Sequence, residues 1–190
     1  MTRFPLFIVV TALCAFPACM DQRLAPYVVL GNQAAKVEEF RAVAEQGNAE
    51  DQYNLGVRYH RGQGAPQDYQ EAIRWYRLAA MQGYSDAQYT LCVMSDIGRG
   101  LLQDYQEALR WCRLAADQGQ GGAMYNLGAH YHSARGVSHD LLQAHMWYNL
   151  AEAHGYENGA KWRDRIALLM TPAEIGKAQQ LAREWKPKTP

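Results

Sequence analysis

Hydrophobic positions in this chain recur with a period of 36 residues. When the sequence is compared with itself at that shift, leucines, tyrosines, alanines and tryptophans fall into shared columns, as expected of repeated structural units. The aligned columns are Tyr53, Tyr89 and Tyr125; Leu55, Leu91 and Leu127; Ala72, Ala108 and Ala144; and Trp75, Trp111 and Trp147. They define complete repeats at 49–84, 85–120 and 121–156, and residues 36–48 match the second half of an earlier one. We therefore assign residues 35–156 to one repeat domain.

The spacing of apolar residues predicts two helices in each repeat. In the first half, Leu55 and Tyr59 fall on one face of a helix. In the second half, the apolar side chains between Ala72 and Ala80 follow the i, i+3, i+4, i+7, i+8 spacing of a helix that buries one stripe. A repeat of this kind buries its apolar faces only against its neighbours. The sequence therefore predicts an all-α fold, a right-handed α/α solenoid of helix-turn-helix repeats.

Capping signals mark the ends of the second helices. Asp68 can cap the second helix of the first repeat, and Glu71 stands three residues later, where it would complete a capping box. The same device recurs as Asp104 with Glu107 and as Asp140 with Gln143. The glycines that close the units, Gly47, Gly83, Gly119 and Gly155, suit the left-handed conformation that ends a helix. Gly56 and Gly128 lie inside the first helices, and we expect them to let the two helices of a repeat approach closely.

Residues 157–190 depart from the repeat and predict C-terminal capping helices followed by a tail. Thr171, Pro172 and Glu174 provide a helix cap, a proline at the first helical position and a returning carboxylate. The helix that they begin carries Ile175, Ala178, Ala182 and Trp185 on one stripe. Such a helix would cover the open end of the solenoid. We expect residues 186–190 to be a frayed tail.

Charge and histidine placement exclude several classes of function. The chain has 19 basic and 19 acidic residues, so it lacks the positive surface that nucleic acid requires. His130 and His132 point about 200° apart on their predicted helix. His60, Asp96 and His132 share a column, but their helices should lie roughly 10 Å apart, too far to share a metal ion. No nucleophile or phosphate-loop motif is present. We therefore predict no metal, no cofactor and no catalytic residue.

The first residues carry an export signature. Arg3 precedes an uncharged apolar run from Phe4 to Phe16, about the length of a signal-peptide core. We therefore interpret residues 1–19 as a signal peptide and residues 20–34 as a tether, which places the mature protein in the periplasm or on the envelope. The alternative is a buried N-terminal helix. Cys19 follows a small residue just after the apolar run, as in a bacterial lipoprotein signal, so Cys19 is either lipidated or lies next to an ordinary cleavage site.

The repeat motif resembles that of the Sel1-like repeat family, relatives of the tetratricopeptide repeats. The motif comprises residues 52–56 with Tyr59, Gly62-x-Gly64, Asp68, residues 72–80 and Gly83, and it recurs three times between residues 36 and 156. The second repeat departs at Cys92 and Ser95, and the third has Ala134 in place of the first loop glycine. The resemblance implies an adaptor or scaffold for other proteins, with the first helices lining the concave surface. It also raises an alternative function, because some cysteine-rich secreted relatives have been proposed to bind or hydrolyse β-lactams. Those relatives carry a regular cysteine pair in each repeat, and this chain does not.

Angles around the first helices predict where a protein or peptide partner would bind. Tyr53, Val57, His60 and Arg61 fall within one arc, away from Leu55. Repetition turns that arc into columns, and the predicted partner-binding residues are Tyr53, Val57, His60, Arg61, Tyr89, Asp96, Tyr125 and His132. Tyrosine offers a large contact area with few rotatable bonds, which suits a binding surface. The alternative is that the tyrosines only pack one repeat on the next.

Cys92 and Cys112 lie on the two helices of the second repeat, in the glycine and tyrosine columns. Antiparallel pairing would set these two positions about one turn apart. We therefore expect two small buried thiols, and a disulfide in an oxidising compartment is the alternative.

Overall fold

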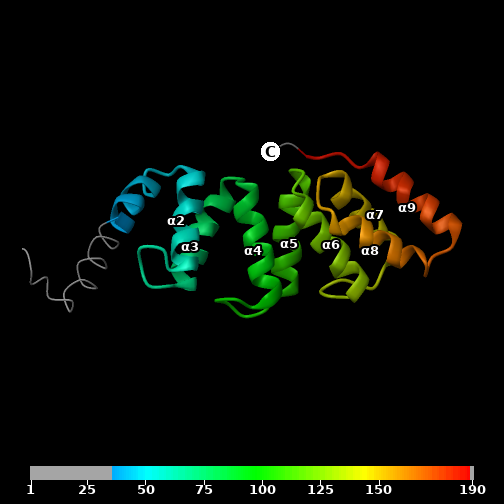
Figure 1. Ribbon diagram of the computed structural model, residues 1–190, viewed down its shortest axis with the longest axis horizontal. Helices are drawn as coiled ribbons and strands as arrows, with labels where there is room; N and C mark the ends of the chain where they lie inside the picture. The colour runs from blue at the N-terminus through cyan, green and yellow to red at the C-terminus, as the bar shows by residue number, and fades with distance from the viewer. Residues whose placement is uncertain (1–35, 189–190) are drawn as a thin grey trace, which may run out of the picture.

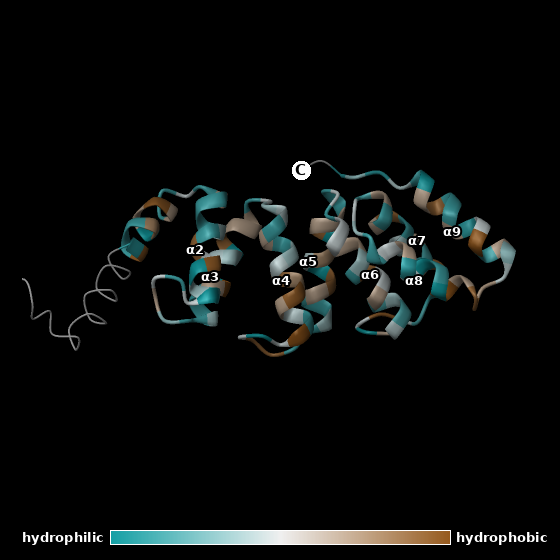
Figure 2. Cartoon of the chain, viewed as in Figure 1, coloured by the Kyte–Doolittle hydropathy of each residue, from teal (hydrophilic) through white to brown (hydrophobic). Residues whose placement is uncertain are grey.

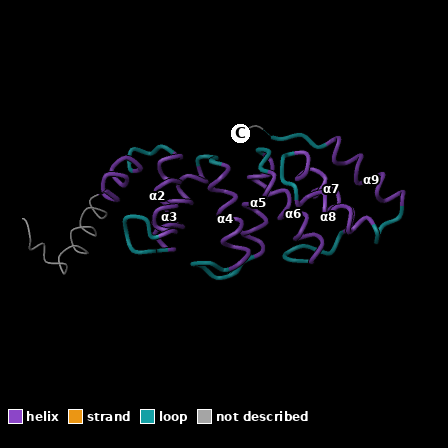
Figure 3. The backbone as a smooth tube through the Cα atoms, viewed as in Figure 1, coloured by secondary structure: helices purple, strands orange, loops and turns teal. Residues whose placement is uncertain are grey.

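A computed structural model describes residues 36–188 of the chain. Within that range the chain forms helices and loops and no strand (Figure 3). A helical segment at residues 36–44 comes first. The helices that follow are α2 (Ala49–Arg61), α3 (Tyr69–Met81), α4 (Ser85–Ile97), α5 (Tyr105–Asp117), α6 (Gly121–Ser133), α7 (Leu141–Ala153), α8 (Asn158–Ala167) and α9 (Pro172–Glu184). The predicted signal peptide, its Cys19 and the tether lie outside the described residues.

The helices stack as successive pairs, which confirms the predicted all-α solenoid. Each of the pairs α2 with α3, α4 with α5 and α6 with α7 is one repeat, and the pairs follow one another along the molecule (Figure 1). Helices α8 and α9 complete the far end, and the segment after α9 turns back toward the middle of the molecule (Figure 1). Hydrophilic and hydrophobic residues alternate along the helices (Figure 2), as expected where each helix has one face toward a neighbour.

The predicted aspartate caps of the second helices form, but none of the capping boxes predicted with Glu71, Glu107 and Gln143 does. Asp68 and Asp104 each accept hydrogen bonds from the backbone N–H groups two and three residues later, at 2.8 to 3.0 Å. Glu107 does not return to its cap, because its carboxylate accepts from Trp111 Nε1 at 3.2 Å and pairs with Arg77 of the preceding repeat at 3.3 Å. A complete capping box forms at Thr171 and Glu174, where the sequence predicts it.

Close packing of a glycine against a tyrosine joins the two helices of the first and third repeats. A Cβ atom added to Gly56 would lie 2.7 Å from the ring of Tyr76, and one added to Gly128 would lie 2.7 Å from the ring of Tyr148. Contacts this short are not tolerated between non-bonded carbon atoms of a packed core. Glycine is therefore required for the helices to approach so closely, as the sequence predicts, although the main partner is the tyrosine ring rather than the alanine column.

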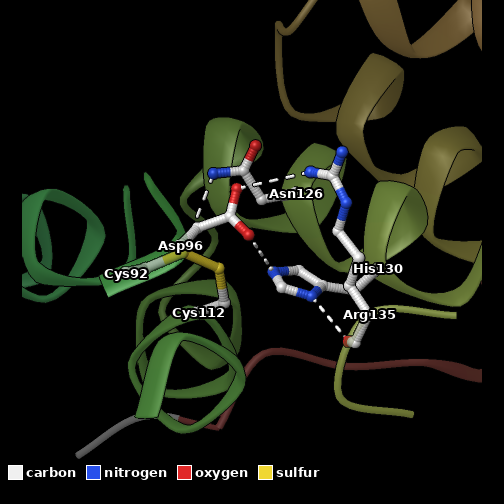
Figure 4. Close-up of a disulfide and its surroundings, with 6 residues drawn as sticks. All are labelled: Cys92, Asp96, Cys112, Asn126, His130 and Arg135. Atoms are coloured by element: carbon white, nitrogen blue, oxygen red, sulfur yellow. Dashed lines mark hydrogen bonds and ion pairs between the residues drawn. A yellow bond between two sulfur atoms is a disulfide. The ribbon is translucent and has the colours of Figure 1, made fainter. Parts of the chain in front are cut away.

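In the second repeat, a disulfide bond between Cys92 and Cys112 occupies the same place (Figure 4). Both side chains are fully buried, and their Cα atoms lie 5.1 Å apart, within the range that a disulfide spans. The prediction of two separate thiols is therefore wrong. Its error was to place the two columns one turn apart, whereas the contact of Gly56 with Tyr76 shows that they face each other directly.

Buried glutamines connect one repeat to the next. Gln52 Nε2 donates to the carbonyl oxygen of Ala44 at 3.3 Å, and Gln52 Oε1 accepts from Gln82 at 2.8 Å. Gln88 makes the same pair of bonds one repeat later, to Ala80 at 3.0 Å and from Gln118 at 2.8 Å. The carbonyl acceptors lie near the ends of second helices, where backbone oxygens lack helical partners. Met124 occupies this column in the third repeat, so this ladder of side chains ends there.

The disulfide predicts a specific response to substitution. Replacing both Cys92 and Cys112 by alanine should lower the free energy of unfolding by about 2–4 kcal/mol, because the closed loop in the unfolded chain is lost. Replacing them by the pair found in the neighbouring repeats, Cys92→Gly with Cys112→Tyr, should recover part of that loss through ring packing.

Urea unfolding with and without dithiothreitol measures both effects. The reductant should destabilise the wild-type protein and leave the glycine–tyrosine variant unchanged. Equal stability of the wild-type protein in both buffers would contradict a structural role for this bond.

Candidate functional site

The tyrosines of the first helices lie at the junctions between repeats. The ring of Tyr53, on α2, is half-buried, and its centre lies 5.5 Å from that of Tyr76 and 5.2 Å from that of Tyr84, which precedes the next first helix. Tyr125 makes the equivalent contacts two repeats later, with Tyr148 at 5.5 Å and Tyr156 at 4.9 Å. Both sets of contacts lie within one repeat, 49–84 for Tyr53 and 121–156 for Tyr125, and part of each ring stays accessible.

Tyr89 adopts a different position because the second repeat lacks both of these partners. Cys112 stands in the column of Tyr76, and Gln120 stands in the column of Tyr84. The ring of Tyr89 instead covers Gly122, where an added Cβ would lie 2.8 Å from Cζ of the tyrosine. Burial raises the pKa of Tyr89, and the nearby Tyr156 raises it further. Tyr89 therefore leans toward the third repeat.

These contacts define a partly exposed aromatic surface along one side of the solenoid. We call it the tyrosine face, and it consists of Tyr53, Tyr84, Tyr89, Tyr125 and Tyr156. Sequence reasoning identified three of these residues and missed Tyr84 and Tyr156. Both occupy one column of the 36-residue repeat, so the periodicity contained the signal that would have found them.

The histidines of the predicted binding column do not form one site. His60 packs edge-on against Tyr69, with ring centres 5.2 Å apart, and its Nδ1 lies 3.3 Å from the hydroxyl of Tyr76. His132 lies against Trp162 of α8, with ring centres 5.6 Å apart. Each imidazole therefore belongs to its own repeat. Between residues 36 and 188 there is no cluster of three or more histidine, cysteine or acidic side chains suited to a metal ion.

Burial and nearby cations favour the neutral form of both histidines. Burial lowers the pKa of His60, and the charges of Arg99 and Arg61 lower it further. Burial likewise lowers the pKa of His132, with contributions from His139 and Arg165. Above the ordinary histidine pKa of 6.5, both side chains therefore face their surroundings as uncharged rings.

Asp96 occupies the same column but links the second repeat to the third. One carboxylate oxygen lies 3.5 Å from His130 Nε2, and the other lies 3.7 Å from Arg135 Nη1 (Figure 4). His130 Nδ1 lies 2.8 Å from the carbonyl oxygen of Arg135, and it donates because that oxygen can only accept. Asp96 is 19% exposed and His130 is 2% exposed. Asp96 therefore connects two repeats, and its predicted role in partner binding stays a prediction.

The remaining predicted residues differ in accessibility. Val57 is half-buried, and Arg61 is exposed at the end of α2. Ile97, the counterpart of Arg61 in the second repeat, is 49% exposed. This arrangement of rings, hydroxyl groups and a few accessible apolar and cationic groups suits contact with another polypeptide, since aromatic side chains supply area and hydroxyl groups supply hydrogen bonds. None of the described helices combines the length and the apolar character needed to cross a membrane.

The chain is similar to known repeat proteins in both sequence and structure. The Sel1 repeat model matches the chain at residues 49–84, 85–120 and 122–156. Among solved structures, c5321, a protective antigen of uropathogenic Escherichia coli strains with an SLR fold, is 40% identical, with a TM-score of 0.62, over 65% of this chain and 26% of that one. A Sel1 repeat protein from Oxalobacter formigenes is 28% identical, with a TM-score of 0.64, over 82% of this chain and 59% of that one. The chain thus spans less than two thirds of either protein. A search of curated proteins gives no match.

The buried histidines predict that acid destabilises the fold. Burial lowers the pKa of His60, His132 and His145 below 6.5, so the unfolded chain binds protons more readily than the folded one. Stability should be complete above about pH 6.5 and fall as the pH drops toward the folded-state values. His145 is 2% exposed and shares a column with Ile73 and Leu109, so His145→Leu should make the loss smaller.

Urea unfolding at about pH 7.5 and about pH 5.5 tests this. A wild-type protein that is equally stable at both values, or a His145→Leu variant with an undiminished loss, would contradict the assignment.

Proposed function

The chain belongs to the Sel1 repeat family, and we propose that it is a scaffold that holds a partner protein or peptide on its tyrosine face. Sel1 repeat proteins generally mediate protein–protein interactions, and their fold is typically a non-enzymatic scaffold. The tyrosine face is the surface through which this member does so. In this proposal it lines the concave side of the solenoid, where an extended peptide or a helix would contact several repeats at once.

The observation that carries the proposal is the way in which the five tyrosines are held. Each ring is partly exposed; Tyr53 and Tyr125 pack against rings of their own repeat, and Tyr89 packs on Gly122 of the following repeat. A side chain that is already immobilised loses little conformational entropy when a partner covers it. Tyrosine hydroxyl groups are protonated donors at neutral pH, and burial raises the pKa of Tyr84 and Tyr125 further. Rings held in place with hydroxyl groups available suit recognition of a polypeptide.

We further propose that the protein acts in the bacterial cell envelope. The buried disulfide between Cys92 and Cys112 supports this location, because structural disulfides form in oxidising compartments such as the periplasm. The apolar run from Phe4 to Phe16 supports it independently. In this proposal residues 1–19 are removed, and the domain is either free or attached to the membrane through lipid on Cys19, with residues 20–34 as the tether.

Substitution on the tyrosine face tests the binding proposal. Tyr89→Ala and Arg61→Ala should both reduce recovery of a specific partner from cross-linked cell envelopes. Arg61 is exposed, so its replacement should change the free energy of unfolding by no more than about 0.5 kcal/mol. Arg113→Ala is the matched control, because it removes an exposed arginine from a second helix, α5.

The measurement is quantitative mass spectrometry of captured proteins, together with a melting curve for each variant. Unchanged recovery with both face variants, in proteins that remain folded, would show that the partner binds elsewhere. A loss of equal size with Arg113→Ala would remove the distinction between the two surfaces.

Mass spectrometry of the intact protein from its native cells tests the location. We expect a processed chain that begins near residue 19 or 20, and acyl chains on Cys19 would establish the lipoprotein form. Full-length protein that retains Met1 in the cytoplasm would overturn the proposal.

A further inference from the structure

The segment after α9 binds to the second helices of two successive repeats. Trp185 packs edge-on against Trp147 of α7, with ring centres 6.1 Å apart, and against His154, with ring centres 5.7 Å apart. Three residues later, the backbone N–H of Lys188 donates to the carbonyl oxygen of Asp117 at 2.7 Å, and Lys188 Nζ lies 3.3 Å from the carboxylate of Asp117. The prediction of a frayed tail is therefore wrong for residues 186–188. This segment lies extended along the solenoid, directed back toward its middle (Figure 1).

The contact at Asp117 has a simple electrostatic origin. Asp117 is the last residue of α5, and the final turn of that helix contains no basic side chain. Unpaired carbonyl groups make a helix C-terminus electronegative. Lys188 supplies the missing cation and binds the terminal carbonyl oxygen, so residues 185–188 are held at both ends, by the aromatic contact and by this cap.

A groove begins where this segment stops. It has a volume of about 390 Å³, and Lys188 forms one of its edges. The other residues that line it come from the end of α3 and the loop after it, from α4 and from α5 with its cap; they are Ala80, Met81, Gly83, Gln88, Arg110, Trp111, Leu114, Asp117 and Gln118. We call it the α3–α5 groove.

The α3–α5 groove is the counterpart, one repeat earlier, of the surface that binds residues 185–188. A shift of 36 residues converts each contact of the tail into a residue of the groove: Trp147 becomes Trp111, His154 becomes Gln118, and Asp117 becomes Met81. The groove therefore lies where the track of residues 185–188 would continue, but Trp111 is only 4% exposed and is covered by Arg110, whereas Trp147 is partly exposed. Residues 185–188 thus show that an extended segment with an aromatic residue can cover such a surface.

Differences between the two surfaces indicate what the groove would accept. The position of Asp117 is taken by Met81, which is 70% exposed, so the residue that meets it should be apolar and not a lysine. Leu114 is 41% exposed and adds to the apolar floor. Arg110 lies over the ring of Trp111, with its guanidinium carbon 4.2 Å from the ring centre, where the third repeat has Met146. An aromatic side chain can stack on this guanidinium group. The next residues of this chain, Thr189 and Pro190, carry neither kind of side chain.

We propose that the α3–α5 groove is a second binding site, which takes an extended segment of a partner protein carrying an aromatic residue and, three positions later, an apolar residue. The aromatic side chain stacks on the guanidinium group of Arg110 beside Leu114, and the apolar one lies at Met81. The segment continues the path of residues 185–188 in the same direction. This site is formed mainly by second helices, whereas the tyrosine face belongs mainly to first helices. The two proposals can therefore be tested independently.

Two synthetic peptides test the site on the full-length protein. One has the sequence of residues 183–190, and the other is the same peptide with Lys188→Leu, so that an apolar residue meets Met81. The protein is labelled with ¹³C in its methionine methyl groups, and the Met81 signal is followed during titration. We expect the leucine peptide to shift this signal saturably and to bind more tightly than the unmodified peptide.

Surface variants show whether the binding occurs in the groove. Leu114→Asp should weaken binding of the leucine peptide by at least about tenfold, because it places a carboxylate in the apolar floor. Leu168→Asp is the control, since Leu168 is 86% exposed and lies at the end of α8, outside the groove. A leucine peptide that leaves the Met81 signal unchanged, or that binds both variants equally, would overturn the proposal. Tighter binding of the unmodified peptide would overturn it in favour of the tail of a second copy.

Discussion

The distance between the two helices of a repeat is the constraint on which the rest of this structure depends. Where Gly56 meets Tyr76 and Gly128 meets Tyr148, a missing side chain on one helix makes room for a large ring on the other. The ring then contacts Tyr53 or Tyr125 on the first helix of the same repeat. The position of the surface tyrosines is therefore a consequence of packing inside each repeat. A larger residue at either glycine would separate the helices and displace the tyrosine face with them.

The second repeat satisfies the same constraint by different chemistry. A covalent bond between Cys92 and Cys112 brings the helices together without a ring between them. Because that ring is absent, Tyr89 has no partner within its own repeat and packs on Gly122 of the next one. Asp96 also reaches forward, to His130 and Arg135. Tyr89 and Asp96 thus connect the second repeat to the third, in addition to the helix packing that joins successive repeats.

Much of the fold could be predicted from the sequence, because periodicity and capping are local. The helix pairs, the aspartate caps and the capping box at Thr171 follow from residues a few positions apart, where helix geometry leaves little choice. The site was harder to predict, because it depends on which columns face each other across a helix pair. The disulfide, the lean of Tyr89 and the link from Asp96 to His130 all join residues 20 or more positions apart. Two of these occur where the second repeat departs from the common pattern, so repetition gave no guide to them.

The attachment of Lys188 to Asp117 also limits how the molecule could grow by duplication of its units. The end of the chain spans one repeat step, from Trp147 to the last residue of the preceding second helix. A further copy of residues 85–120, inserted ahead of the third repeat, would present Lys188 with another aspartate. A copy of residues 49–84 in the same place would present it with methionine. Only the first insertion keeps the ion pair of Lys188 with an aspartate. Whether a longer solenoid keeps this contact therefore depends on which repeat is copied.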